Sequence, residues 1–112
     1  MMISTHVLDT SIGRPARSVD VRLAFQRDDD WQEIAHAATD ANGRVGAMVS
    51  DRSSLPAGTY RLTFDVGTYF RGRGVESFYA NVAVEFIVRD AAAHHHVPLL
   101  VSPYGYSTYR GS

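Results

Sequence analysis

The residues in this sequence best suited to chemistry are histidines near its carboxyl end. His94 and His96 are two positions apart, with His95 between them. In a β-strand, side chains two apart point to the same side and lie roughly 7 Å from each other, so these two imidazoles would share one face. An imidazole changes charge near neutral pH and can take a proton from water or bind a metal ion. The pair therefore indicates general-base catalysis or metal binding.

Two further candidates lie far away in the sequence. His6 is in the middle of an expected strand over residues 3–8, and Arg44 directly follows Asn42 and Gly43, which favour a tight turn. Such a turn would place the arginine at the rim of a sheet, although an arginine there is usually solvated. Beside an imidazole, its charge would lower the histidine pKa and keep the ring neutral at pH 7. A neutral histidine and a guanidinium could then activate water and stabilise an oxyanion.

Alternating apolar and polar residues predict the strands that would position these groups. Val97, Leu99 and Val101 alternate with Pro98, Leu100 and Ser102, which is typical of a strand buried on both faces or lying in an interface. Similar patterns between turn residues predict strands over 3–8, 18–26, 31–39, 59–66 and 78–89. Seven or eight short strands with at most one brief helix predict an all-β antiparallel β-sandwich.

The composition fits one domain over residues 1–112 and argues against several classes of protein. The formal net charge is −1 and the eleven basic residues, all arginine, are scattered, so neither a nucleic-acid groove nor binding to an anionic membrane is expected. Cysteine is absent, which excludes a disulfide, a thiolate nucleophile and a cysteine-ligated metal. The amino terminus has neither a basic leader nor a long apolar core, so we expect no signal peptide, no membrane span and a cytoplasmic location.

Three segments together resemble one protein family. They are STHVLDTSIGRPA at 4–16, DANGR at 40–44 and HVPLLVSPYGYSTYRGS at 96–112. In this order they resemble the signatures of the transthyretin-related 5-hydroxyisourate hydrolases. The final tetrapeptide, YRGS at 109–112, is similar to the one that separates these enzymes from the hormone-carrying transthyretins.

The resemblance implies a fold, an activity and an assembly. The fold would be a transthyretin-like sandwich with one short helix within 67–77. The activity would be hydrolysis of 5-hydroxyisourate to 2-oxo-4-hydroxy-4-carboxy-5-ureidoimidazoline in urate (purine) catabolism, with a small-molecule substrate and no cofactor. The assembly would be a homotetramer, a dimer of dimers whose sites lie in a channel between the dimers.

The resemblance also implies roles for particular residues. It gives catalytic roles to His6, Arg44, His96 and Ser112, and substrate-binding roles to Tyr109, Arg110 and Gly111. We expect His96 or His6 to activate water, Arg44 to stabilise the oxyanion and Ser112 to orient the substrate, and the sequence leaves the identity of the base open. At position 95 the family commonly has tyrosine, and we expect His95 to point away from His96.

Two other functions remain possible from the sequence. Three imidazoles, those of His6, His94 and His96, could hold a catalytic zinc ion with one open position, although Arg44 would repel the metal. A transthyretin-like carrier of an aromatic hormone would use the same sandwich without catalysis, because a fold alone does not determine function.

Overall fold

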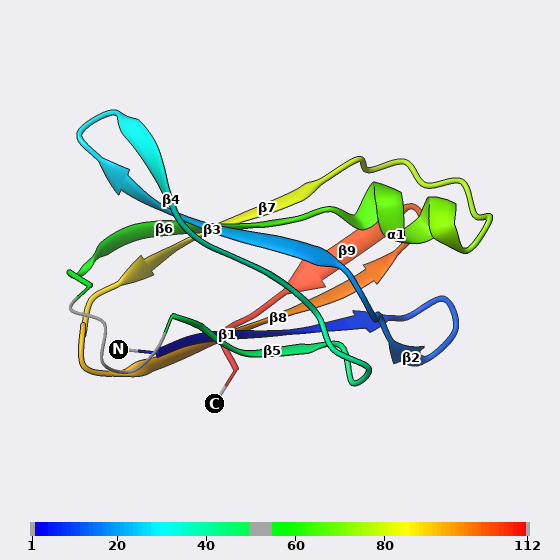
Figure 1. Ribbon diagram of the computed structural model, residues 1–112, viewed down its shortest axis with the longest axis horizontal. Helices are drawn as coiled ribbons and strands as arrows, with labels where there is room; N and C mark the ends of the chain where they lie inside the picture. The colour runs from blue at the N-terminus through cyan, green and yellow to red at the C-terminus, as the bar shows by residue number, and fades with distance from the viewer. Residues whose placement is uncertain (1, 50–54, 112) are drawn as a thin grey trace.

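Two β-sheets face each other as two layers (Figure 1). The computed structural model describes residues 2–49 and 55–111. The sheet that carries the histidines, called here the histidine sheet, contains β1 (Met2–Asp9), β2 (Arg14–Pro15), β5 (Arg44–Val49), β8 (His94–Ser102) and β9 (Gly105–Thr108). The opposite sheet contains β3 (Asp20–Arg27), β4 (Asp30–Ala38), β6 (Gly58–Phe64) and β7 (Val82–Val88). The predicted two-layer sandwich is therefore confirmed.

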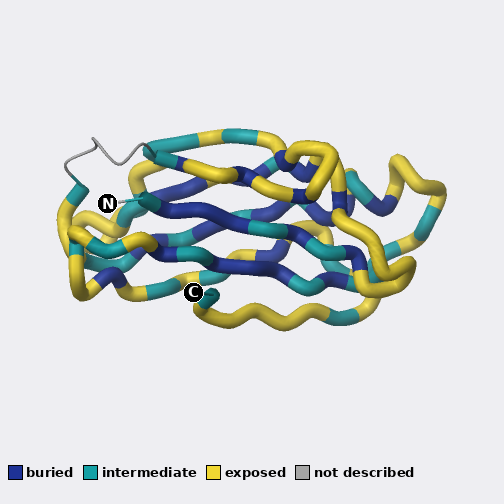
Figure 2. Tube along the Cα trace, turned by 90° about the horizontal axis from the view of Figure 1, so that it is seen from below, coloured by how far each residue is buried: buried dark blue, intermediate teal, exposed yellow. Residues whose placement is uncertain are grey.

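The core between the layers comes from the alternation seen in the sequence. The side chains of Tyr60, Leu62 and Phe64 on β6 are fully buried, and Leu99 and Val101 on β8 are buried as well. Burying one such side chain stabilises the fold by about 1.5–3 kcal/mol. In Figure 2 the buried residues run along the central strands, while loops and the final segment are exposed.

The strand β1 lies at the centre of the histidine sheet and determines which residues meet there. It pairs with β8 on one side and with β2 and β5 on the other. The β1–β8 pair is parallel, whereas the sequence predicted antiparallel pairing throughout. Parallel neighbours need a long crossover connection, and here the entire opposite sheet lies between the two strands in the chain.

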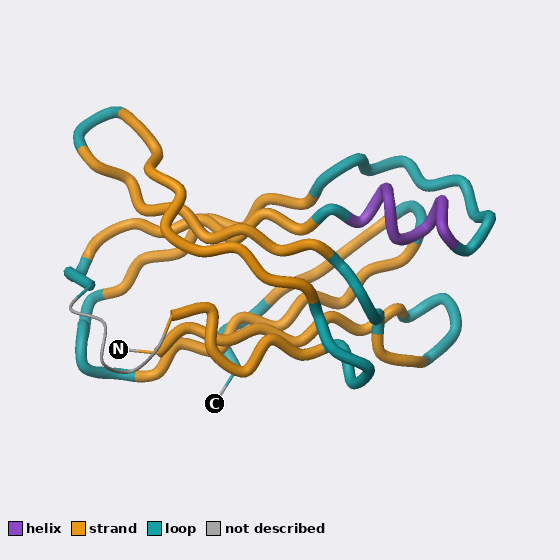
Figure 3. The backbone as a smooth tube through the Cα atoms, in the orientation of Figure 1, coloured by secondary structure: helices purple, strands orange, loops and turns teal. Residues whose placement is uncertain are grey.

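A short helix, α1 (Val66–Gly72), lies at one end of the sandwich (Figure 3) and begins one residue before the region 67–77 where the resemblance implied it. The carboxylate of Asp9, at the end of β1, is fully buried and accepts hydrogen bonds from Tyr69 Oη at 2.8 Å and from Arg73 at 2.9 Å. Burial, followed by this contact with Asp9, raises the pKa of Tyr69 to about 12. These bonds fasten the helix to the end of β1.

Three sequence predictions about strands differ from the structure. The strand predicted over 78–89 begins only at Val82, because Phe78 donates its backbone N–H to Pro103 and Ala80 accepts one from Gly67, so neither joins a ladder. The strand predicted over 59–66 ends at Phe64, where the chain turns into the helix. The strands β2, β5 and β9 were not predicted separately, since they are short and largely exposed.

Within the described residues, no helix is both long and apolar enough to cross a membrane.

Candidate active site

The pairing of β1 with its two neighbours brings together residues from both ends and the middle of the chain. His6 lies opposite Arg44 of β5 and beside Pro98 of β8, while Ser4 lies beside His96. Because Ser4 and His6 are two positions apart on one strand, they face the same side. The structure therefore brings His6, Arg44 and His96 to one face of the histidine sheet.

The turn before β5 positions Arg44. The carboxylate of Asp40 accepts the backbone N–H groups of Asn42 at 2.8 Å and Arg44 at 3.0 Å, and these two bonds lower the pKa of Asp40. Gly43 has a φ of +73°, and a Cβ there would collide with the backbone oxygen of Val7. Glycine is required at this position, and the arginine consequently enters β5 at a fixed point beside His6.

A serine hydroxyl links the two histidines. Ser4 Oγ lies 2.7 Å from His94 Nε2 and 2.7 Å from His96 Nδ1. These three residues and Arg44 line a cavity of about 240 Å³ together with Thr5, Val45 and Gly46. His94 is exposed, whereas Ser4 is only 4% exposed and His96 is half-buried. The prediction that His94 and His96 share one face is confirmed.

The surroundings of His96 favour its neutral form. Burial lowers the pKa of this histidine, and the nearby charges of Arg44, His94 and His6 lower it further. A low pKa leaves a ring nitrogen free to accept a proton near neutral pH. The effect of Arg44 on His96 that the sequence predicted is therefore present in the structure.

The carboxyl end of the chain returns to His96. The backbone N–H of Gly111 donates to the His96 carbonyl at 2.8 Å. A Cβ at Gly111 would lie 2.5 Å from His96 Cδ2, so only glycine lets the backbone pass so close to the ring. The next residue, Ser112, lies outside the described residues.

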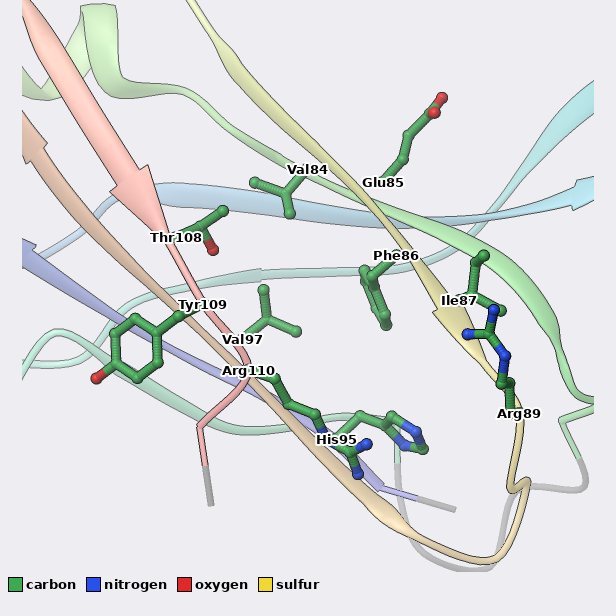
Figure 4. A pocket seen from close by; sticks show the side chains of 10 residues that line it. All are labelled: Val84, Glu85, Phe86, Ile87, Arg89, His95, Val97, Thr108, Tyr109 and Arg110. Carbon is green, nitrogen blue, oxygen red and sulfur yellow. The ribbon is translucent and has the colours of Figure 1, made fainter.

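The side chains of Tyr109 and Arg110 line another cavity, of about 340 Å³, between β7 and the end of the chain (Figure 4). His95 lines it too, being 5% exposed and donating Nδ1–H to the carbonyl of Ala93 at 3.0 Å. His95 thus points away from His96, as expected. Of the three predicted substrate-binding residues, Gly111 contacts His96, whereas the side chains of Tyr109 and Arg110 line this other cavity. Their binding roles stay predictions.

Sequence reasoning missed Ser4. It stands two positions before His6, but its contact with His94 and His96 depends on the register of strands about 90 residues apart, which no local pattern reveals. Among the described residues, no group of three histidine, aspartate or glutamate side chains has an arrangement able to hold a metal ion.

Comparison with known proteins identifies the family. The model of the HIUase/transthyretin family matches residues 3–111. The chain belongs to this family. Its relatives include a probable 5-hydroxyisourate hydrolase of Caenorhabditis elegans, 50% identical over 110 residues that make up 98% of this chain and 81% of the relative. The 5-hydroxyisourate hydrolase of Salmonella dublin is 40% identical over 111 residues, 99% of this chain and 81% of the relative.

Solved structures of this family resemble the chain closely. The 5-hydroxyisourate hydrolase of Klebsiella pneumoniae has a TM-score of 0.87 and 38% identity, covering 100% of both chains. Sea bream transthyretin in complex with thyroxine has a TM-score of 0.91 and 30% identity, covering 99% of this chain and 95% of that one. Fold similarity does not distinguish the hydrolases from the transthyretins, so the residues of the site must distinguish them.

Proposed function

We propose that this protein hydrolyses 5-hydroxyisourate, opening its six-membered ring to 2-oxo-4-hydroxy-4-carboxy-5-ureidoimidazoline as a step of urate breakdown. The observation that carries the proposal is the meeting of His6, Arg44 and His96 at one face, beside a cavity that Arg44 and His96 line. A carrier of a hormone needs no neutral imidazole beside a guanidinium. The identity of 40–50% with hydrolases supports the same conclusion.

His96 is the base in this mechanism. Its Nδ1 is engaged by Ser4, whereas its Nε2 makes no hydrogen bond to the described residues and can face a water molecule. The water oxygen bonds to the ring carbonyl carbon as Nε2 takes one proton of the water. The C–N bond then breaks, and the leaving nitrogen receives the proton back from His96. The product carboxylic acid ionises, which releases one proton per turnover.

Arg44 stabilises the negative charge that develops on the carbonyl oxygen during attack. Its guanidinium is always charged and carries only donors, so it suits an oxyanion and cannot compete for the proton. His6, directly opposite Arg44 in the sheet, holds the substrate ring in this proposal. The zinc hypothesis is not needed, because a neutral imidazole and a guanidinium suffice for attack by water.

The end of the chain completes the site. Ser112 follows Gly111, whose backbone is bonded to His96, and we assign to the Ser112 hydroxyl and terminal carboxylate the orientation of the substrate. Tyr109 and Arg110 shape the pocket from a neighbouring chain, since their side chains line the other cavity within one chain.

The proposal includes a homotetramer, a dimer of dimers located in the cytoplasm. The outermost strands β7 and β9 support an assembly, because each has an edge without a partner strand among the described residues. Apolar side chains near these edges are strongly exposed, with Ile87 at 53% and Phe78 at 73%. Exposed edges and apolar groups of this kind favour association with other chains.

The second candidate is a carrier of an aromatic hormone, which the similarity to sea bream transthyretin in complex with thyroxine favours. One experiment separates the two functions. 5-Hydroxyisourate is generated in situ by oxidation of urate, and its decay is followed in the ultraviolet with and without the protein. A hydrolase accelerates the decay in proportion to protein concentration. A carrier leaves the decay unchanged and binds thyroxine in a parallel titration.

A further inference from the structure

The hydroxyl of Ser4 lies between two imidazoles, and this arrangement limits their protonation. A serine hydroxyl has a single proton to donate and can accept through its lone pairs. Ser4 Oγ is within 2.7 Å of a ring nitrogen of His94 and of one of His96. Among the described residues the hydroxyl contacts no acceptor other than these two ring nitrogens, so its own proton goes to one of them. The hydroxyl then accepts from the other ring, and the tautomers of the two neutral histidines are coupled.

Two arrangements satisfy these contacts. In the first, His96 Nδ1–H donates to Ser4 and the Ser4 hydroxyl donates to His94 Nε2, which leaves the lone pair of His96 on Nε2. In the second, His94 Nε2–H donates to Ser4 and Ser4 donates to His96 Nδ1, which places a proton on His96 Nε2. Only the first arrangement gives His96 a free lone pair toward the cavity, so only the first lets it act as a base.

The charge of Arg44 favours the first arrangement. Arg44 and His96 line the same cavity, and a guanidinium, which has only donors, is attracted to a ring nitrogen that presents a lone pair and repelled by one that presents a proton. The exposure of His94 also fits, because its Nδ1–H can then donate to solvent. Ser4 itself is only 4% exposed, so water does not readily replace its partners.

We infer that Ser4 is a positioning residue: its hydroxyl accepts from His96 Nδ1–H and donates to His94 Nε2, and so fixes the tautomer of His96 whose Nε2 takes the proton of water. The inference rests on the proposed function for its catalytic meaning. The tautomer itself is a property of the free protein and is measured without substrate.

The first test is nitrogen NMR of the wild-type protein labelled with ¹⁵N at histidine, at about pH 8, where imidazoles are neutral. Protonated and lone-pair ring nitrogens resonate far apart, and single substitutions assign the five histidines. We expect His96 to carry its proton on Nδ1 and His94 to have a lone pair on Nε2. A proton mainly on His96 Nε2 in the wild type overturns the inference, whatever the enzyme activity.

The second test is kinetic. Ser4→Ala should move His96 toward the Nε2–H tautomer and lower kcat about 3- to 10-fold, the range set by the loss of one hydrogen bond, with KM changed less than about twofold. Ser4→Thr keeps a hydroxyl and should restore kcat. The matched control is Thr10→Ala, which removes another hydroxyl bonded to β8, at Val101 O, away from the histidines. This control should leave kcat unchanged.

His94→Leu tests the other end of the link. Without an acceptor at position 94, the Ser4 hydroxyl turns to donate to His96 Nδ1, so kcat should fall as in Ser4→Ala. The double variant should be no slower than either single variant, because both remove the same link. Additive losses, or wild-type kcat in a folded Ser4→Ala protein, overturn the inference.

These outcomes are distinct from failure of the proposed function. If the wild type does not accelerate the decay of 5-hydroxyisourate, the hydrolase proposal fails and the NMR result still decides the tautomer. If Ser4→Ala does not fold, as judged by its thermal melt, the wild-type spectrum decides alone. If the wild type is active and its His96 carries the proton on Nε2, the role of Ser4 is refuted while the hydrolase proposal stands.

Discussion

Replacing Gly111 by alanine should disable the site while leaving the fold intact. The added Cβ would lie 2.5 Å from His96 Cδ2 and 3.3 Å from Cγ. Non-bonded carbon atoms prefer a separation of about 3.5–4.0 Å, so the two groups must move apart by about 1 Å. Either the imidazole turns and loses its bond to Ser4, or the end of the chain detaches from the His96 carbonyl.

A displacement of about 1 Å in a catalytic group costs on the order of 100-fold in rate, and we expect kcat/KM of Gly111→Ala to fall by that factor. The free energy of unfolding should change by less than about 1.5 kcal/mol, because only one backbone hydrogen bond near a terminus is at risk. The assay is the decay of 5-hydroxyisourate in the ultraviolet, together with a urea titration. Gly72→Ala, where nothing lies within 4 Å of the added Cβ, is the matched control. A Gly111→Ala protein with the kcat/KM of the wild type would refute this account of the glycine.

Three further predictions concern charge. The pKa of His96 lies below its ordinary value of 6.5, because of burial and the charges of Arg44 and the other histidines. Protonation in acid removes the lone pair that acts as the base. A plot of kcat/KM against pH should therefore be level near neutrality and fall in acid with a midpoint below 6.5. Arg44→Gln should lower kcat/KM by about 10²–10³, as loss of an oxyanion donor does, and raise that midpoint, which the same pH series measures; an unchanged rate would exclude Arg44 from the mechanism. Asp9→Asn, which weakens a fully buried acceptor of Tyr69 and Arg73, should lower the free energy of unfolding by about 1–3 kcal/mol in urea titration, and an unchanged titration would show that these bonds contribute little.

Much of the fold could be predicted from the sequence because the longer strands each carry an apolar pattern of their own, which the short, exposed strands β2, β5 and β9 lack. The alternation of Tyr60, Leu62 and Phe64 predicts a buried face, which is confirmed. The apolar run after His96 predicts a strand buried on both faces or lying in an interface, and the structure buries its Val97, Leu99 and Val101 face but leaves Leu100 and Ser102 on the other face half-buried. The predicted start of β7 was wrong because Phe78 bonds to Pro103, in the turn between β8 and β9, and Ala80 bonds to Gly67 of α1. Contacts made in the folded chain decide such boundaries, and local propensity does not.

The candidate site was predictable to a different extent at each residue. The shared face of His94 and His96 follows from spacing on one strand, and the prediction is confirmed. The convergence of His6 and Arg44 with them came from family resemblance, since it depends on pairing between distant strands. The contact of Ser4 with His94 and His96 could not be predicted, because it depends on the register between β1 and β8.

The most direct measurement is kcat/KM for 5-hydroxyisourate of His96→Ala beside the wild type, with thermal melts to show that both are folded. If the imidazole of His96 takes the proton of the attacking water, kcat/KM falls by about 10²–10⁴, the usual contribution of a general base. A folded His96→Ala protein whose kcat/KM stays within about threefold of the wild type would contradict the proposed mechanism.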